Sequence, residues 1–388
     1  MLKLSAFWMV LYIAVLSFAM TDAAESAATQ SDGMAQPDNG NGTTARQPSS
    51  PVSKIEAEAR SGNPKLEEAL GHLYLMRGNG VQPDYAKALG WFRKSAAQGC
   101  AAAEADLGAM YGHGDGVTQS YPKALAWYRM AAAQGNANAE ESLGTMYMDG
   151  SGVNRNYTEA AGWYYEAAIQ GNAVAQDTLG EMYVLGVGVQ KSDAGAIAYF
   201  RESAKQGNAV AQYDLGYMYE RGVGVPRDYT RAAKWFGQSA SQGYAKAEEH
   251  LGFMYLKGNG VPLSGVDALA WLNKAADQGD TIAERDIGSM YALGKSVPVN
   301  YATALKWFSK AAERGDGPAQ YELAELYATG RGTRQDNTSA LKWLILANAH
   351  GVSTARSYMA TVEKRMTPAQ VATARHDAQT WKLFHWSH

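Results

Sequence analysis

The sequence repeats itself every 36 residues, and this period constrains the fold more than any other feature. Glycine recurs at this interval from Gly99 to Gly351, and alanine does so from Ala88 to Ala340. An aromatic residue follows each of these alanines by three positions: Trp91, Trp127, Trp163, Tyr199, Trp235, Trp271, Trp307 and Trp343. A long fixed period is typical of solenoids, whose units stack because none can bury its apolar face alone.

Each unit is predicted to contain two short helices. In one unit, Ala103, Leu107 and Tyr111 lie at i, i+4 and i+8, which makes one stripe on a helix, and Gly108 leaves space for a neighbouring helix to approach closely. A helix-capping residue then recurs with the same period, at Asp84, Ser120, Asn156, Ser192, Asp228, Ser264, Asn300 and Asp336. The side-chain oxygen of such a residue accepts a free backbone N–H of the first helical turn, so the second helix of each unit is expected to begin there.

Glycines are expected to reverse the chain between the helices. Gly222 and Gly224 belong to a G-x-G-V turn that recurs in other units, and glycine tolerates the positive φ that a tight turn needs. Gly243, at the end of its unit, fits the left-handed position that closes a helix. A phosphate-binding loop is the alternative for the turn, but such a loop occurs once and follows a strand. The stretch GSMYALGKS also lacks that loop's spacing, and we expect no nucleotide or other cofactor.

These motifs resemble the Sel1-like repeat, a relative of the tetratricopeptide repeat. The pattern is A-x-x-x-L-G-x-x-Y-x-x-G-x-G-V followed by D/N/S-Y-x-x-A-x-x-W-x-x-x-A-A-x-x-G, and residues 209–243 match it closely. The resemblance covers residues 61–351. It implies an all-α fold, a right-handed superhelical solenoid of about eight helix-turn-helix repeats, which serves as a protein-interaction scaffold, often in the bacterial envelope.

Both ends of the array depart from the pattern, as expected for repeats that face solvent on one side. The first unit has one extra residue before its turn, in GHLYLMRGNGV. The seventh unit has Ser296 in place of the second turn glycine, and the eighth has Ala324 and Thr333 at motif glycine and valine positions.

A final helix is predicted to cap the array. Thr367 and Gln370 form a T-x-x-Q capping box, with Pro368 at the first helical position. The helix is expected to span 368–384 within a capping segment at 352–388. Three apolar residues at its end are expected to pack against the last repeat: Leu383, Phe384 and Trp386.

The N-terminal residues predict export. Lys3 precedes the apolar run LSAFWMVLYIAVLSFAM, and small residues follow, which is the pattern of a secretory signal peptide. We expect residues 1–23 to be removed and no membrane span to remain, because a span needs about 20 apolar residues. A signal that is not cleaved would instead anchor the chain. The protein is therefore expected to be periplasmic or secreted.

The rest of the chain is predicted to divide into a linker and the repeats. Residues 24–54 are rich in Ser, Gly, Pro and Asn, which favours a disordered linker, and the eight repeats are expected at 55–351. The formal net charge is −3, so no nucleic-acid partner is expected, since phosphate binding needs a basic surface. The pattern leaves the oligomeric state open.

No catalytic or metal site is predicted. The seven histidines show no H-E-x-x-H spacing, and His385 and His388 at the tail are a weak metal pair at best. Some members of the resembled family carry a disulfide in each repeat and are linked to β-lactam binding, but this chain has one cysteine, Cys100. A cell-wall or β-lactam-processing enzyme and a glycan-binding module remain the alternatives to a non-catalytic scaffold.

Two further features are given a structural interpretation. The tryptophan series could suggest sugar binding, but its recurrence at one position of the second helix favours a role in the core. The acidic pairs at 140–141 and 248–249 are interpreted as solvated helix faces.

The positions that vary between repeats are the best candidates for partner binding. If first helices line the inner face, three series of residues point along it, at −3, +1 and +4 from the motif glycine. Aromatic and acidic residues of these series gather in the middle of the array, which suits a protein or peptide segment with some positive charge. The predicted partner-binding residues are Tyr213, Tyr217, Phe253, Glu181, Glu220 and Glu249.

Overall fold

The computed structural model describes residues 51–76 and 83–385, and every regular element in these ranges is a helix. This confirms the all-α prediction. The predicted signal peptide and most of the predicted linker lie outside the described residues, as do the first repeat's turn, Trp386 and His388. Helix α2 (Pro51–Ala59) begins inside the range predicted as linker. Among the described helices, none is both long and apolar enough to cross a membrane.

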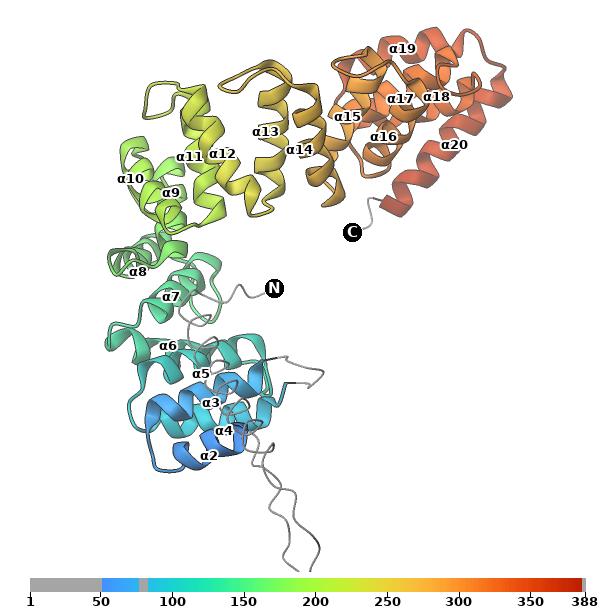
Figure 1. The fold of residues 1–388 in the computed structure, drawn as a ribbon. Coiled ribbons are helices and arrows are strands. Elements are labelled where there is room, and N and C mark those ends of the chain that lie inside the picture. The colour runs from blue at the N-terminus through green and yellow to red at the C-terminus, as the bar shows by residue number, and fades with distance from the viewer. Residues whose placement is uncertain (1–50, 77–82, 386–388) are drawn as a thin grey trace, which may run out of the picture. The chain divides into compact units, whose positions relative to one another are not determined.

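The helices follow one another as antiparallel pairs, one pair for each repeat (Figure 1). The first helices of the repeats are α3 (Pro64–Leu75), α5 (Ala101–His113), α7 (Ala137–Asp149), α9 (Ala173–Leu185), α11 (Ala209–Arg221), α13 (Ala245–Lys257), α15 (Thr281–Leu293) and α17 (Gly317–Thr329). The second helices are α4 (Tyr85–Ala96), α6 (Tyr121–Ala133), α8 (Tyr157–Ile169), α10 (Asp193–Lys205), α12 (Tyr229–Ser241), α14 (Gly265–Asp277), α16 (Tyr301–Glu313) and α18 (Asn337–Ala349).

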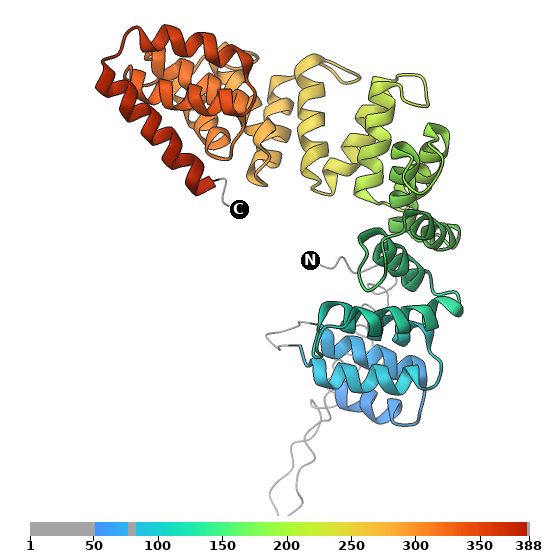
Figure 2. The ribbon, with the colours of Figure 1, turned by 180° about the vertical axis from the view of Figure 1, so that it is seen from behind.

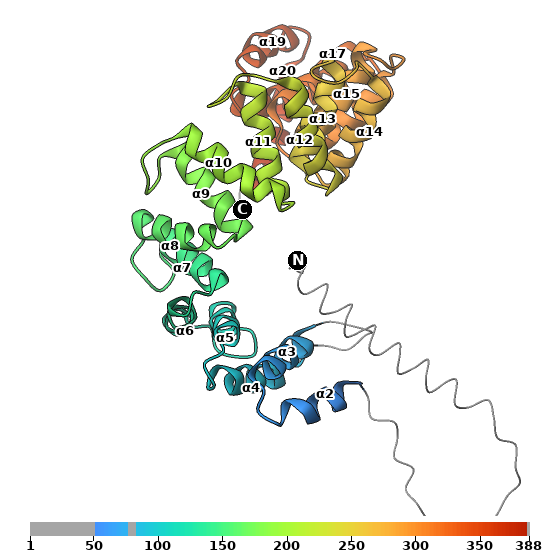
Figure 3. The ribbon, with the colours of Figure 1, turned by 60° about the vertical axis from the view of Figure 1, so that its left-hand side comes forward.

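The described residues form two compact units, which divide between Ala139 and Glu140 inside α7. In the first unit, α2 packs beside α3, and Ile55 and Ala59 join Leu70 and Trp91 in one apolar cluster (Figure 3). The second unit ends with α19 (Ser353–Glu363) and α20 (Pro368–His385), and α20 packs against α18 (Figures 1 and 2).

The motif glycine of each first helix lets an aromatic ring of the second helix approach closely. A Cβ atom at Gly216 would lie 2.9 Å from the ring of Phe236, which is fully buried. The same contact recurs between Gly144 and Tyr164, Gly180 and Phe200, and Gly288 and Phe308, and Leu272 takes the place of the ring over Gly252. The space predicted at the motif glycine is therefore confirmed, and its occupant is the residue that follows the tryptophan position.

The tryptophans are less buried than predicted. Trp91 and Trp343 are buried, but Trp127, Trp235 and Trp271 are half-buried and pack on the edges of the core clusters. Lysine Nζ atoms lie over several of these rings, at 3.8 Å from the centroid for Lys274 and Trp271. The core position of the second helix is thus one residue further on, because that residue faces the motif glycine.

The predicted caps and turns are confirmed with one exception. Each of the eight capping residues is the N-cap of a second helix, and Asp228, for example, accepts from the backbone N–H of Arg231 at 2.9 Å. Ser120 makes no such side-chain bond at the start of α6. Gly222 and Gly224 both have positive φ, at 71° and 67°, as the turn requires.

A recurring hydrogen bond between polar side chains, which we call the polar ladder, joins the two helices within a repeat. The glutamine just after a second helix donates from its amide Nε2 to the residue four before the motif glycine, at 2.6 to 2.8 Å: Gln98 to Glu67, Gln134 to Glu104, Gln170 to Glu140, Gln206 to Gln176, Gln242 to Gln212 and Gln278 to Glu248. In the seventh repeat, Lys310 and Arg314 pair with Glu284 instead.

This ladder corrects the interpretation of the acidic pairs as solvated faces. Glu140 and Glu248, the first member of each pair, are 5% and 3% exposed. Burial raises the pKa of both carboxyls, against the hydrogen bond from the glutamine. Buried polar groups need a partner, and here the partner comes from the second helix of the same repeat.

The C-terminal cap forms as predicted, but different residues pack. The backbone N–H of Thr367 donates to Oε1 of Gln370 at 2.9 Å, and that of Gln370 donates to Oγ1 of Thr367 at 3.3 Å, so the capping box is confirmed. Leu383 is exposed rather than buried. Trp381 packs instead, with its ring edge-on to Trp343 at 6.1 Å between centroids, because it lies on the same face of α20 as buried Ala374 and Ala378.

Ser296 is the one residue besides glycine that has a positive φ in the described part of the chain, at 62°. In other repeats this turn residue is a glycine that touches the first residue of the preceding second helix, as Gly260 touches Tyr229. Ser296 faces Gly265 at that place, where an added Cβ would lie 1.9 Å from the Cβ of Ser296. At this contact, therefore, the glycine lies on the helix that the turn touches and not in the turn itself.

We expect Ser296→Gly to stabilise the protein by about 1 kcal/mol, since it removes the strain of a left-handed non-glycine residue. Gly265→Tyr should destabilise the protein alone and should be tolerated together with Ser296→Gly, which restores the arrangement of the other repeats. Urea unfolding of the four proteins in a double-mutant cycle measures this coupling. Additive effects of the two substitutions would contradict the compensation.

Candidate functional site

Neighbouring repeats meet along their first helices at three recurring positions. These are the −3 and +1 positions of one repeat and the −2 position of the next, counted from the motif glycine. Because the period is 36 residues, the −3 residue and the following −2 residue are 37 apart, as are Tyr213 and His250. The hydroxyl of Tyr213 lies 3.1 Å from Nε2 of His250. We call each such set of three residues a junction triad.

The composition of the junction triads changes from one junction to the next along the second unit. The ring, hydrogen-bond and charge interactions between their members form a continuous line from α9 to α19, which we call the first-helix face. In order, the triads are Asp177, Glu181 and Asp214; Tyr213, Tyr217 and His250; Glu249, Phe253 and Asp286; Arg285, Ser289 and Glu322; and Tyr321, Glu325 and Tyr358.

Four of the six predicted partner-binding residues lie around His250: Tyr213, Tyr217, Glu220 and Glu249. Tyr213 stacks on Tyr217 at 6.4 Å between ring centroids, and both rings lie edge-on to His250. His250 Nδ1 is 3.5 Å from Glu220, and its Nε2 is 3.6 Å from Glu249. His250 is therefore the hub of the cluster, although the sequence analysis did not select it.

The charges in this cluster are coupled through the imidazole. Burial of His250 opposes its protonation, but the hydrogen bond to Glu220 and the charge of Glu249 outweigh this effect and raise the pKa of the ring. Burial raises the pKa of Glu249 to about 7, in spite of the opposing charge of His250. The shift of His250 therefore comes from its acidic neighbours, and the shift of Glu249 comes from burial.

The exposed aromatic residues have basic neighbours that were not predicted. Tyr217 and Phe253 are each 37% exposed, whereas Tyr213 is half-buried and supports the other rings. Arg221 lies over the ring of Tyr217, and Lys257 lies over Phe253, each at 5.3 Å from the centroid. The rim of this surface is therefore mixed in charge rather than purely acidic.

Glu181 belongs to a different cluster from the four predicted residues around His250. It lies with Asp177 and Asp214, and each residue of this acidic triad offers a carboxylate oxygen within 4.8 Å of the other two. Asp177 Oδ1 and Asp214 Oδ2 are buried and find no hydrogen-bond partner among the described residues. Glu181 is exposed at the edge of the triad.

Burial and mutual repulsion keep protons on the acidic triad. Burial, with the nearby charges of Asp214 and Glu181, raises the pKa of Asp177 to about 8. Burial and the charge of Glu181 raise the pKa of Asp214 to about 7, and Lys246 opposes this shift. Two carboxyls of the triad therefore titrate near neutral pH.

The first unit contains a triad at the same positions with a built-in cation. His72, at +1 in the first repeat, lies 3.1 Å from Glu68 and 2.9 Å from Asp106, which take the −3 and −2 places. Burial disfavours the charged ring, but hydrogen bonds to Asp106 and Glu68 outweigh it and raise the pKa of His72 to about 9. This triad contains a cation of its own, and the acidic triad does not.

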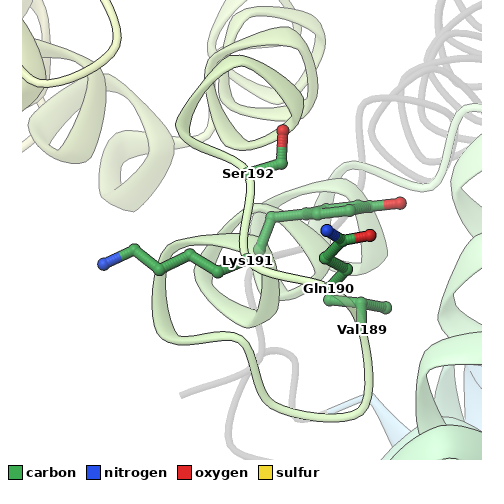
Figure 4. Close-up of a pocket in the computed structure, with 5 residues that line it drawn as sticks. Val189, Gln190, Lys191 and Ser192 are labelled. Carbon is green, nitrogen blue, oxygen red and sulfur yellow. The ribbon is translucent and has the colours of Figure 1, made fainter.

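A pocket beside the turn between α9 and α10 does not resemble an active site. It is lined by Tyr183 and by residues 189–192, and Lys191 is its one charged lining residue. Figure 4 shows the Lys191 side chain extending away from Gln190 and Val189. An acid–base or nucleophilic mechanism needs convergent titratable groups, which this pocket does not provide.

Comparisons with known proteins agree with the repeat architecture. The family model described as Sel1 repeat matches eight consecutive segments: residues 67–100, 101–136, 137–172, 173–208, 209–244, 245–280, 281–316 and 317–352. None of the curated proteins matches the sequence.

Two solved structures are similar over most of the chain. One is a protective antigen present in uropathogenic Escherichia coli strains that displays an SLR fold; it is 32% identical, with 86% of this chain and 79% of that chain covered and a TM-score of 0.54. The other is a Sel1 repeat protein from Oxalobacter formigenes, 31% identical, with 80% and 90% covered and a TM-score of 0.58.

We expect the acidic triad to make stability fall as pH rises. The folded pKa values of Asp177 and Asp214, about 8 and about 7, exceed the ordinary value of 3.8, so the folded protein holds more protons at neutral pH than the unfolded chain does. The free energy of unfolding in metal-free buffer should therefore decrease between about pH 5 and pH 9. Asp177→Asn combined with Asp214→Asn should reduce this decrease, and exposed Asp277→Asn should not. An equal slope in all three proteins would contradict the assignment.

Proposed function

Because the chain belongs to the Sel1 repeat family, we propose that it is a non-catalytic scaffold that binds a segment of a partner protein along its first-helix face. The repeat solenoid of this family is suited to protein interaction, since it presents an extended and preformed surface. A preformed surface lowers the entropy lost on binding.

The observation that carries this proposal is the contrast between constant and varying positions. Positions that hold the repeats together keep one chemistry in most repeats, such as the motif glycine and the glutamine of the ladder. The junction triads instead change from acidic to aromatic and then to mixed charge along α9 to α15. Residues that are free of a shared packing role and differ in a fixed order are suited to recognise one sequence of a partner.

The central part of the face indicates the chemistry of that partner. Tyr217 and Phe253 expose ring surface for an apolar side chain, and aromatic anchors of this kind dominate many interfaces. Glu220 and Glu249 favour a basic residue nearby, while Arg221 and Lys257 favour an acidic one further out. The bound segment is expected to place an apolar residue between charges of opposite sign.

We expect the substitutions Tyr217→Ala and Phe253→Ala together to weaken partner binding by at least about tenfold, since they remove two exposed anchors. Adding Tyr213→Ala should weaken it further, because Tyr213 supports the other rings. The measurement is affinity capture from a native extract, followed by titration of the captured protein. Tyr165→Ala is the matched control, since Tyr165 is an exposed tyrosine on second helix α8. Undiminished binding with an unchanged circular dichroism spectrum would overturn the assignment of the face.

We also propose that the protein acts outside the cytoplasm, as its N-terminal residues suggest. The support is the basic residue, apolar run and small residues within 1–23, which together are typical of a signal peptide. Mass spectrometry of the purified native protein should find a mature N-terminus near Ala19 or Ala23, and cell fractionation should find the protein in the envelope or the medium. A full-length chain confined to the cytosol would contradict the proposal.

A further inference from the structure

The acidic triad is the strongest unexplained cluster in the described part of the chain. Asp177 is 8% exposed, its Oδ1 has no hydrogen-bond partner among the described residues, and its carboxyl lies beside those of Glu181 and Asp214. A buried carboxylate without a partner is costly, and bringing like charges together adds to that cost. The three carboxyls come from two neighbouring helices: Asp177 and Glu181 lie on α9, and Asp214 lies on α11 (Figures 1 and 3).

The chain itself shows what such a triad requires. At the same three positions in the first unit, His72 places a positive charge between Glu68 and Asp106. In the acidic triad, the position of this histidine is taken by Glu181, which adds a third carboxyl. The triad itself contains no cation, so its carboxyls either hold protons or need a cation from outside.

We propose that Asp177, Glu181 and Asp214 bind a divalent cation, with Ca²⁺ preferred over Mg²⁺. Carboxylate oxygens without histidine or cysteine favour such hard ions. The three oxygens lie within 4.8 Å of one another, close enough for one ion to contact all of them. Ca²⁺ accepts irregular sets of oxygen ligands, whereas Mg²⁺ demands near-ideal octahedral geometry, so three carboxylates from two packed helices favour Ca²⁺.

The burial of the oxygens favours an ion over a basic side chain of a partner. Asp177 Oδ1 and Asp214 Oδ2 are closed to solvent, so a bulky lysine or arginine head group would have to separate the two helices. A single ion needs only a small movement of the exposed Glu181, and water can complete its coordination on that side. Tyr164, Tyr213, Tyr244 and Lys246 are the other titratable groups that act on the cluster, and of these only Lys246 is basic.

The direct test is titration of the metal-free full chain with Ca²⁺ and with Mg²⁺ by isothermal calorimetry. We expect one Ca²⁺ site, weaker binding of Mg²⁺, and an increase in the midpoint of thermal unfolding with Ca²⁺. Asp177→Asn and Asp214→Asn should each weaken Ca²⁺ binding by at least about tenfold, since losing even an outer-shell group costs that much at metal sites. Glu141→Gln is the matched control, because Glu141 takes the −3 position one repeat earlier and its bond from Thr145 can persist.

Proton release provides a second readout that a merely structural role would not produce. The cation should displace protons from Asp177 and Asp214, so the calorimetric heat at neutral pH should depend on the ionisation enthalpy of the buffer. This dependence should be absent when both aspartates are replaced by asparagine. It should also shrink at alkaline pH, where the carboxyls are already ionised.

A further variant gives the acidic triad the histidine that the first unit's triad has at the same position. Glu181→His places an imidazole between Asp177 and Asp214, as His72 lies between Glu68 and Asp106. We expect this variant to lose the Ca²⁺ response and to be more stable than the parent protein in metal-free buffer at neutral pH. Glu181→Gln should lose the Ca²⁺ response and gain less stability, since it removes a charge without adding the opposite one.

The possible outcomes separate clearly. A saturable Ca²⁺ response that the triad variants lose and Glu141→Gln keeps supports the site. No response in the parent protein, or a response that survives Asp177→Asn with Asp214→Asn, overturns it. Binding of a lysine-rich or arginine-rich peptide that needs the triad, without any Ca²⁺ response, also overturns it and assigns these carboxylates to partner recognition instead.

Discussion

The structure depends on a close contact between the two helices of each repeat, in which a large side chain of the second helix lies over the motif glycine of the first. The absence of a Cβ at Gly216 lets the ring of Phe236 come within contact of the backbone, and a methyl group there would force the helices apart. This contact fixes how far each helix is rotated about its axis. It thereby determines that the residue before each buried ring, such as Trp235, lies at the edge of the core rather than in it.

Once each hairpin has a fixed shape, stacking by a constant step determines the rest. Residues 36 apart occupy equivalent places, so a residue of one first helix meets the residue 37 further on, as Tyr213 meets His250. The polar ladder within the repeats recurs with the same step: Gln242 donates to Gln212, and Gln278 donates to Glu248. The packing contacts are thus the same in successive repeats. The residues of the junction triads differ from repeat to repeat, although their positions stay the same.

Much of the fold could be predicted from the sequence, because its signals are local or strictly periodic. The N-cap at Asp228, the turn glycines and the capping box at Thr367 each depend on residues a few positions apart. The site was predictable only in part. Glu140 and Glu248 were misinterpreted because their partners lie 30 residues away. His250 and Asp214 were missed because they occupy the −2 series, whose role appears only when one first helix is placed beside the next; a 37-residue comparison of first helices would have found both.

The two triads with matching positions show how a repeat protein separates stability from function. His72 places a cation beside Glu68 and Asp106, so that junction contains a charge that offsets part of theirs. Asp177, Glu181 and Asp214 occupy the same framework with three carboxyls and no cation of their own, and burial and repulsion raise the pKa of both aspartates. Natural sequences keep such local conflicts mainly where binding or chemistry depends on them. Because the glycine contacts and the glutamine hydrogen bonds recur on both sides of it, this junction can remain unsatisfied within the chain and respond to what the chain binds.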